Sequence, residues 1–123
     1  MIFNKNIEAF AKINSFFLQV LVTGNHLQIL TMSIPQKGEM GEVVHDGDQV
    51  FIVVEGEGHA MVAGEKTPAG SDHMIFVPGG MVHNIVNTGV VDLKLYAICG
   101  PPQHKPATIH TTKAEADAAS QMM

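Results

Sequence analysis

The feature that most constrains this chain is a repeated alternation of short β-forming runs and turn residues that begins near Phe16. Clusters such as Thr23-Gly24-Asn25 and Asp46-Gly47-Asp48 separate the runs, and no helix-forming stretch of useful length lies between them. This spacing predicts an all-β fold, an antiparallel sandwich or β-barrel, rather than a βαβ fold. The predicted strands cover residues 16–22, 26–34, 42–45, 49–54, 59–63, 73–77, 82–87 and 90–98.

A short extension precedes the predicted barrel, which spans residues 16–99. Residues 1–15 are mixed in pattern, without the alternation of a strand. Three apolar residues in this extension have helical spacing, and we expect one short helix that lies on the body of the fold. These residues are Ile7, Phe10 and Ala11.

A tail of different character follows the barrel and covers residues 100–123. It opens with Gly100-Pro101-Pro102, where the prolines stop the last strand. Thr112 and Glu115 have the spacing of a capping box and predict the start of a second short helix. We therefore expect the tail to pack on the barrel and to end in this helix.

Size and charge limit the function classes. The chain has 123 residues, enough for one domain, and its net charge of −5 leaves no basic stripe for nucleic acid. The apolar run of residues 16–22 is too short to cross a bilayer. Cys99 is the single cysteine and cannot form an internal disulfide. We expect a cytoplasmic protein with a buried thiol, and neither a nucleic acid nor a membrane as partner.

Three polar residues are the candidates for a metal site. His45 and Gln49 flank a tight turn, and side-chain alternation allows both to point inward. His83 lies 38 positions after His45 and must come from another hairpin. Two imidazoles and one amide oxygen in an apolar barrel suit a divalent transition metal such as Mn, Fe, Ni, Zn or Cu, with water completing its shell.

Two segments around these residues resemble the paired motifs of the cupin family. In the first, residues 41–56, His45 and Gly56 align with the family pattern, but Val43 stands at the position of a histidine and Gln49 at that of a glutamate. The second, residues 78–87, matches more completely, through Pro78, Gly80, His83 and Asn87.

The resemblance implies a jelly-roll barrel, also called a double-stranded β-helix or RmlC-like fold, with short terminal helices. Further segments resemble small bacterial cupins labelled mannose-6-phosphate-isomerase-like, among them Ile75-Phe76-Val77-Pro78 and Pro101-Pro102-Gln103-His104. The family pattern implies that His45, Gln49 and His83 hold the metal and that the protein forms a homodimer. The two departures from the pattern imply that the metal is weakly bound.

Each candidate residue also has a purely structural interpretation. Backbone or water can satisfy the two histidines at a barrel rim, and Gln49 can serve to orient one of them. The large side chains are expected to form core or cavity wall, with Val43, Phe51 and Tyr96 assigned to the wall. We expect His104 and His110 to be solvated loop residues. No role is assigned to His26, His59 and His73.

Two functions are compatible with these observations. The first is a metal-binding cupin that acts as a metal-dependent enzyme on a small polar molecule, as a dioxygenase or a sugar-isomerase-like enzyme. The second is a non-catalytic module that binds or senses a small metabolite and has a degenerate metal site, which the valine at position 43 favours. No general base of fixed position is identifiable, so the sequence assigns no catalytic residue.

Overall fold

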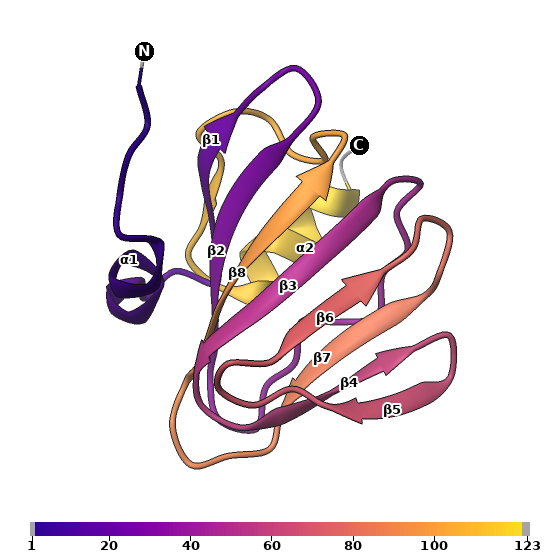
Figure 1. Cartoon of the computed structure of the whole chain (residues 1–123). Helices are drawn as coiled ribbons and strands as arrows, with labels where there is room; N and C mark the ends of the chain where they lie inside the picture. The colour runs from indigo at the N-terminus through magenta and orange to yellow at the C-terminus, as the bar shows by residue number, and fades with distance from the viewer. Residues whose placement is uncertain (1, 122–123) are drawn as a thin grey trace.

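The computed structural model describes residues 2–121 as two antiparallel β-sheets and two short helices (Figure 1). The large sheet has the strand order β6-β3-β8-β2-β1-β9, and the small sheet has the order β5-β4-β7. The elements are α1 (Ile7–Ile13), β1 (Leu18–Thr23), β2 (Gln28–Ile34), β3 (Asp48–Glu55), β4 (Gly58–Val62), β5 (Glu65–Pro68), β6 (Met74–Val77), β7 (His83–Asn87), β8 (Leu93–Gly100), β9 (Ile109–His110) and α2 (Lys113–Gln121).

Strand alternation puts one face of each central strand into the core between the sheets. In β8, Leu95, Ala97 and Cys99 are fully buried. They stand opposite Val53, Phe51 and Gln49 of β3 and opposite Met32, Leu30 and Gln28 of β2. Because β8 pairs with β3 on one side and β2 on the other, it connects the two halves of the large sheet. Its inward-facing side chains form the centre of the core on this sheet.

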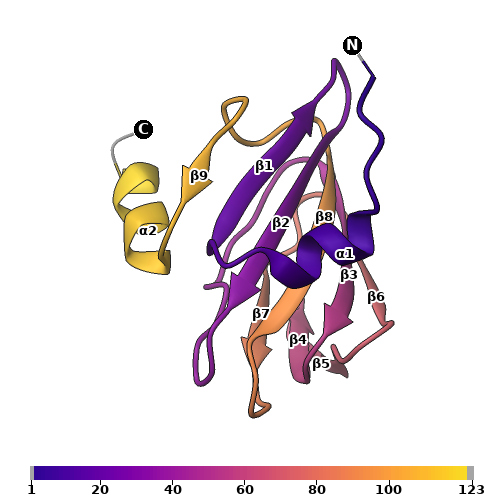
Figure 2. The same ribbon diagram turned by 90° about the vertical axis from the view of Figure 1, so that its left-hand side faces the viewer.

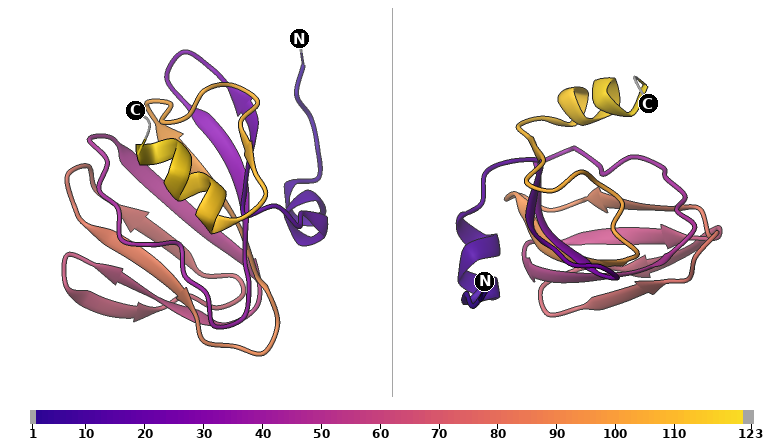
Figure 3. Two further views of the ribbon diagram at one scale, coloured as in Figure 1. Left: turned by 180° about the vertical axis from the view of Figure 1, so that it is seen from behind. Right: turned by 90° about the horizontal axis from the view of Figure 1, so that it is seen from above.

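The two helices lie on different sides of the large sheet (Figures 2 and 3). Helix α1 contacts β2, β3 and β8, and Asn6 caps its first turn by accepting a hydrogen bond from the Ala9 N–H (3.0 Å). Helix α2 follows β9, and Thr112 Oγ1 accepts a hydrogen bond from the Glu115 N–H at its start (3.2 Å). Both predicted helices are confirmed. No helix among residues 2–121 is long and apolar enough to cross a membrane.

The all-β antiparallel fold is confirmed, but the strands form two separate sheets and not one closed barrel. The strand predicted for residues 42–45 is wrong, since this segment makes only an isolated bridge between Val43 and His83. Gly41, at φ +99°, interrupts the extended backbone just before it, and its N–H is bonded to Asn84 Oδ1 (2.9 Å). The sequence did not predict β5 or β9.

The central position of β8 predicts where the fold is most sensitive to truncation. Replacing Leu95 with Ala should lower the free energy of unfolding by about 2–5 kcal/mol, because its fully buried side chain leaves a cavity in the core. Urea unfolding measures the change. Val90→Ala is the control, since Val90 is 84% exposed, and should stay within about 0.5 kcal/mol of the wild type. Equal stability of the two variants would contradict the assigned core.

Candidate functional site

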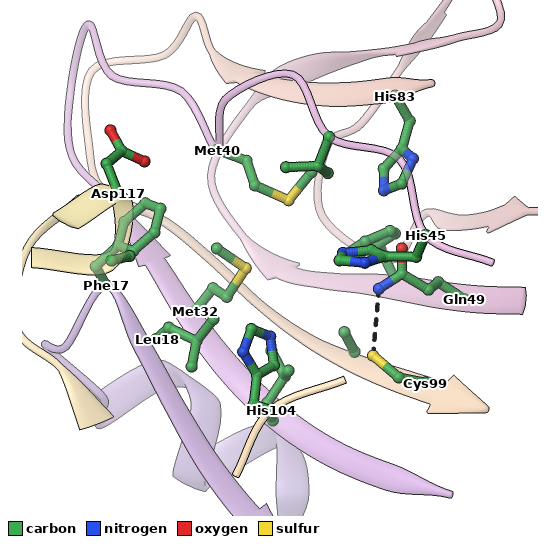
Figure 4. Close-up of a pocket in the computed structure, with 15 residues that line it drawn as sticks. Phe17, Leu18, Met32, Met40, His45, Gln49, His83, Cys99, His104 and Asp117 are labelled. Atoms are coloured by element: carbon green, nitrogen blue, oxygen red, sulfur yellow. Dashed lines mark hydrogen bonds between the residues drawn. The ribbon is translucent and has the colours of Figure 1, made fainter. Parts of the chain in front are cut away.

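A cavity of about 140 Å³ lies between the two sheets and holds the candidate site (Figure 4). This volume is well below the ~300–1,000 Å³ typical of sites for drug-sized ligands, so the cavity suits an ion or a very small molecule. Much of the wall is apolar and contains Phe17, Leu18, Leu30, Met32 and Met40. The polar lining residues include His45, Gln49, His83 and His104.

The His83 side chain comes from β7 of the small sheet and points into the cavity (Figure 4). Its Nδ1 lies 2.9 Å from the carbonyl oxygen of Met81, which can only accept, so Nδ1 carries the proton. Nε2 then has a free lone pair, and this buried atom has no hydrogen-bond partner in the described part of the chain. His83 is 3% exposed. The arrangement leaves a buried imidazole nitrogen available to a ligand.

Gln49 faces the same cavity from β3 of the large sheet. Its Nε2 donates a hydrogen bond to Cys99 Sγ (3.3 Å), which directs Oε1 away from the thiol. Oε1 is buried and, like the imidazole nitrogen of His83, has no partner in residues 2–121. Burial raises the pKa of Cys99, while the bond from Gln49 opposes that rise. The thiol therefore stays protonated at neutral pH and leaves the amide oxygen as the available acceptor.

His45 is held beside the cavity by its backbone. Its carbonyl oxygen accepts a hydrogen bond from the Gly80 N–H (2.7 Å). The backbone next to His45 is closely packed. Gly47 lies against the backbone of Gly100, and Gly79 lies against that of Asp46, so neither position has room for a side chain. The ring centre of His45 lies 6.1 Å from that of His83. His45 and Gln49 do not flank a hairpin as the sequence suggested, because β3 pairs with β6 and β8.

The electrostatics of the cavity favour the neutral forms of His45 and His104. Burial is the main cause that lowers the pKa of His45, followed by repulsion from His83, and a hydrogen bond with Gln103 opposes it. Burial likewise lowers the pKa of His104, with repulsion from His45 and His110 as smaller causes. Neutral imidazoles are the form that binds metal ions.

The structure corrects two of the sequence-based assignments. Tyr96 does not line this cavity, because Leu95 and Ala97 on either side of it point inward and alternation turns its side chain to the outer face, beside Phe3 and Ile7. His104, expected to be solvated, lines the cavity because the tail folds back along the sheet. No local sequence signal distinguishes it from His110, which pairs with Leu18 and lies outside the cavity wall.

The structure also places the other residues that the sequence analysis considered, two on the cavity wall and three away from it. Val43 and Phe51 lie on the cavity wall, and the Phe51 ring centre is 5.7 Å from that of His83. His26, His59 and His73 are not among the lining residues. His73 accepts a hydrogen bond at Nδ1 from the Gly70 N–H (3.0 Å), which gives it a structural role in its loop.

The donor set fits a metal ion bound through few protein ligands. Imidazole nitrogen binds transition metals at about 2.0–2.1 Å, so the neighbouring rings of His45 and His83 can share one ion. Two of the buried atoms without a hydrogen-bond partner, His83 Nε2 and Gln49 Oε1, are lone-pair donors on residues that line this one cavity. Within residues 2–121 no three His, Cys, Asp or Glu side chains are grouped closely enough to hold an ion. An ion here would have two imidazoles, the Gln49 amide oxygen and open positions.

Two sheets with a small histidine-lined cavity between them define this protein as a β-sandwich of the jelly-roll type with a central cavity. The family model described as "Cupin domain" matches residues 30–99, and the chain belongs to the cupin family. The resemblance noted in the sequence is thus confirmed at the level of the family and of the RmlC-like fold.

Similar proteins span bacteria and a virus. The chain is 37% identical over 121 residues to the uncharacterized protein YrkC of Bacillus subtilis, and the match covers 93% of this chain and 65% of YrkC, just under two thirds of its length. A second match is protein L612 of Acanthamoeba polyphaga mimivirus, 29% identical over 110 residues, covering 83% of this chain and 67% of L612. The crystal structure of BH2720 from Bacillus halodurans matches with a TM-score of 0.94 and 39% identity, covering 96% of this chain and 95% of that one.

The lowered pKa values of His45 and His104 predict a stability that falls in acid. Both groups titrate near pH 6.5 when unfolded and lower when folded, so the unfolded chain binds more protons below that pH. The stability that these two groups contribute is therefore fully present above about pH 6.5 and is lost as the pH falls from that value through their lower folded-state pKa values. Melting temperatures measured from about pH 7.5 to about pH 5.5 should decline, and the double variant His45→Gln, His104→Gln should decline less. An equal decline in the variant would contradict this origin.

Proposed function

We propose that the protein binds a divalent transition metal ion through His45 and His83, with Gln49 Oε1 as a third ligand. The observation that carries this proposal is the pair of buried acceptors without partners, His83 Nε2 and Gln49 Oε1, in one cavity. An unsatisfied buried polar atom costs about 1–3 kcal/mol, and a bound cation would remove that cost at both atoms. The neutral state of His45 at pH 7 supports the same assignment.

The ligand that this site receives is a small polar molecule. When bound, such an ion would act as a Lewis acid that polarises an oxygen atom of that molecule. The apolar wall, with Val43 and Phe51, would exclude water around it. A cavity of about 140 Å³ favours a molecule smaller than a phosphorylated sugar.

If the protein is an enzyme, we expect it to be a metal-dependent oxidoreductase or isomerase. Among residues 2–121 the one carboxylate on the wall is that of Asp117, and its Oδ2 is paired with Lys113 Nζ (2.7 Å). It is therefore poorly placed to act as a free general base. The histidines are the remaining candidates for proton transfer.

A second function, binding of a small metabolite without a metal, is favoured by the apolar character of the wall. Val43 occupies a position where an imidazole would add a ligand, and no third charged or imidazole ligand compensates among the described residues. In this case His83 Nε2 and Gln49 Oε1 would accept hydrogen bonds from the metabolite.

Elemental analysis of untagged protein distinguishes the two functions. Wild-type protein should carry near-stoichiometric transition metal, and His45→Ala and His83→Ala should each lose affinity by more than the roughly 10–100-fold that loss of an outer-shell partner costs. His59→Ala is the matched control, since His59 lies in β4 outside the cavity wall, and should keep its metal.

Equal metal content in wild type and His83→Ala would contradict the metal site. Metal-free wild-type protein that releases a small molecule on denaturation, detected by mass spectrometry, would favour the metabolite-binding function.

We also propose that the protein is a homodimer that uses the open edge of the large sheet. Strand β6 is the last strand on that side, and it exposes Met74 (67%) and Phe76 (53%). An unpaired apolar edge of this kind is a site of strand pairing between copies. Light scattering should show a dimer for the wild type and a monomer for Phe76→Glu, with Val90→Glu as a control that remains dimeric. A monomeric wild type would overturn the proposal.

A further inference from the structure

The cavity residue His104 is held in place by one fully buried side chain, Gln28 of β2. Gln28 Oε1 accepts hydrogen bonds from the Gln103 N–H (3.1 Å) and the His104 N–H (3.0 Å). Its Nε2 donates to the His104 carbonyl oxygen (2.7 Å) and to Thr23 Oγ1 (2.9 Å). The amide thus uses both of its donors and both acceptor sites, and three of the four bonds fix the tail backbone at residues 103–104.

This clamp fixes the backbone that carries the imidazole of His104. The tail backbone is irregular here, with no strand or helix between β8 and β9 to hold it. Gln28 instead ties it to the centre of the large sheet, and the His104 side chain lines the cavity. Figure 4 shows His104 and His83 on opposite sides of His45. A ligand that fills the space would therefore meet the tail as well as both sheets.

We propose that His104 is a binding residue of this site, which donates its ring N–H to a small anion held at the open positions of the metal, and that Gln28 positions it. The inference rests on the proposed function, because it takes the metal at His45, His83 and Gln49 as the first anchor of the anion. It adds the tail as the second anchor and names the ligand class.

Beside a bound metal ion, the composition of the wall favours an anion over a second cation as the further ligand. The side chains that bring polar hydrogens or neutral donors to the cavity are imidazoles, an amide and a thiol. The one carboxylate, Asp117, is already paired with Lys113, and its side chain is 53% exposed, so it offers little repulsion to an anion inside. A neutral imidazole always carries one N–H donor, and a hydrogen bond to an anion is stronger than one between neutral groups. The small volume limits the anion to a few atoms.

Azide is a suitable probe, because it is a small anion that gives a visible absorption band when it binds Cu(II). We would load the full chain with Cu(II), titrate azide, and compare variants at equal copper content. The His83→Ala variant supplies the background from copper bound elsewhere. His104→Ala should raise the azide dissociation constant by about tenfold or more, the value of one hydrogen bond to a charged group. His104→Gln, which keeps an N–H donor, should restore much of the affinity.

Two control variants test whether the position of the His104 imidazole matters, and not only its presence. His110→Ala removes a histidine of the same tail that does not line the cavity, and should bind azide as the wild type does. Gln28→Leu keeps His104 but removes the hydrogen bonds that hold its backbone. This variant should bind azide more weakly, while circular dichroism shows that the protein is folded. If Gln28→Leu does not fold, the two His104 variants decide the matter alone.

The outcomes distinguish this inference from the proposed function. Equal azide affinity in wild type and His104→Ala, with copper still dependent on His83, would overturn the inference and leave the metal site standing. Copper binding that does not depend on His83 would overturn both.

Discussion

The antiparallel register of β8 against β3 and β2 is the constraint on which the rest of this structure depends. It sets Cys99 opposite Gln49 and, on the other side, opposite Gln28. Because side chains alternate along a strand, a slip of β8 by one residue would turn Leu95, Ala97 and Cys99 to the outer face and remove the thiol that Gln49 contacts. The site and the anchoring of the tail therefore share one structural origin in the central strand.

Much of the fold follows from local sequence, whereas much of the site does not. Turn residues and alternating runs predicted most strands, and spacing alone predicted both helices. The strand prediction for residues 42–45 was wrong because Gly41, at positive φ, interrupts the extended backbone just before these β-forming residues. The assignment of Tyr96 to the cavity wall was wrong because it rested on the aromatic side chain. Alternation with the inward-facing Leu95 and Ala97 places Tyr96 on the outer face. His104 could not be placed, since its position depends on a bond to Gln28, 76 residues away.

The cavity combines strong shielding with little charge. His45 and His104 favour their neutral forms because burial and repulsion from neighbouring histidines lower their pKa values, and the thiol of Cys99 is neutral because burial raises its pKa. A site built in this way gains its charge from what it binds. This explains how so small a space can hold several titratable groups beside an apolar wall without paired ions inside it.

The late position of β8 in the chain has a consequence for how the protein is made. This strand, Leu93–Gly100, joins β3 to β2 in the middle of the large sheet, yet it comes after both of them in the chain. A chain emerging from the ribosome thus cannot assemble the large sheet until β8 has been synthesised. The pairs that β8 makes with β2 and β3 are distant in sequence, which slows folding. The cavity also requires the segment after β8, because His104 forms part of its wall.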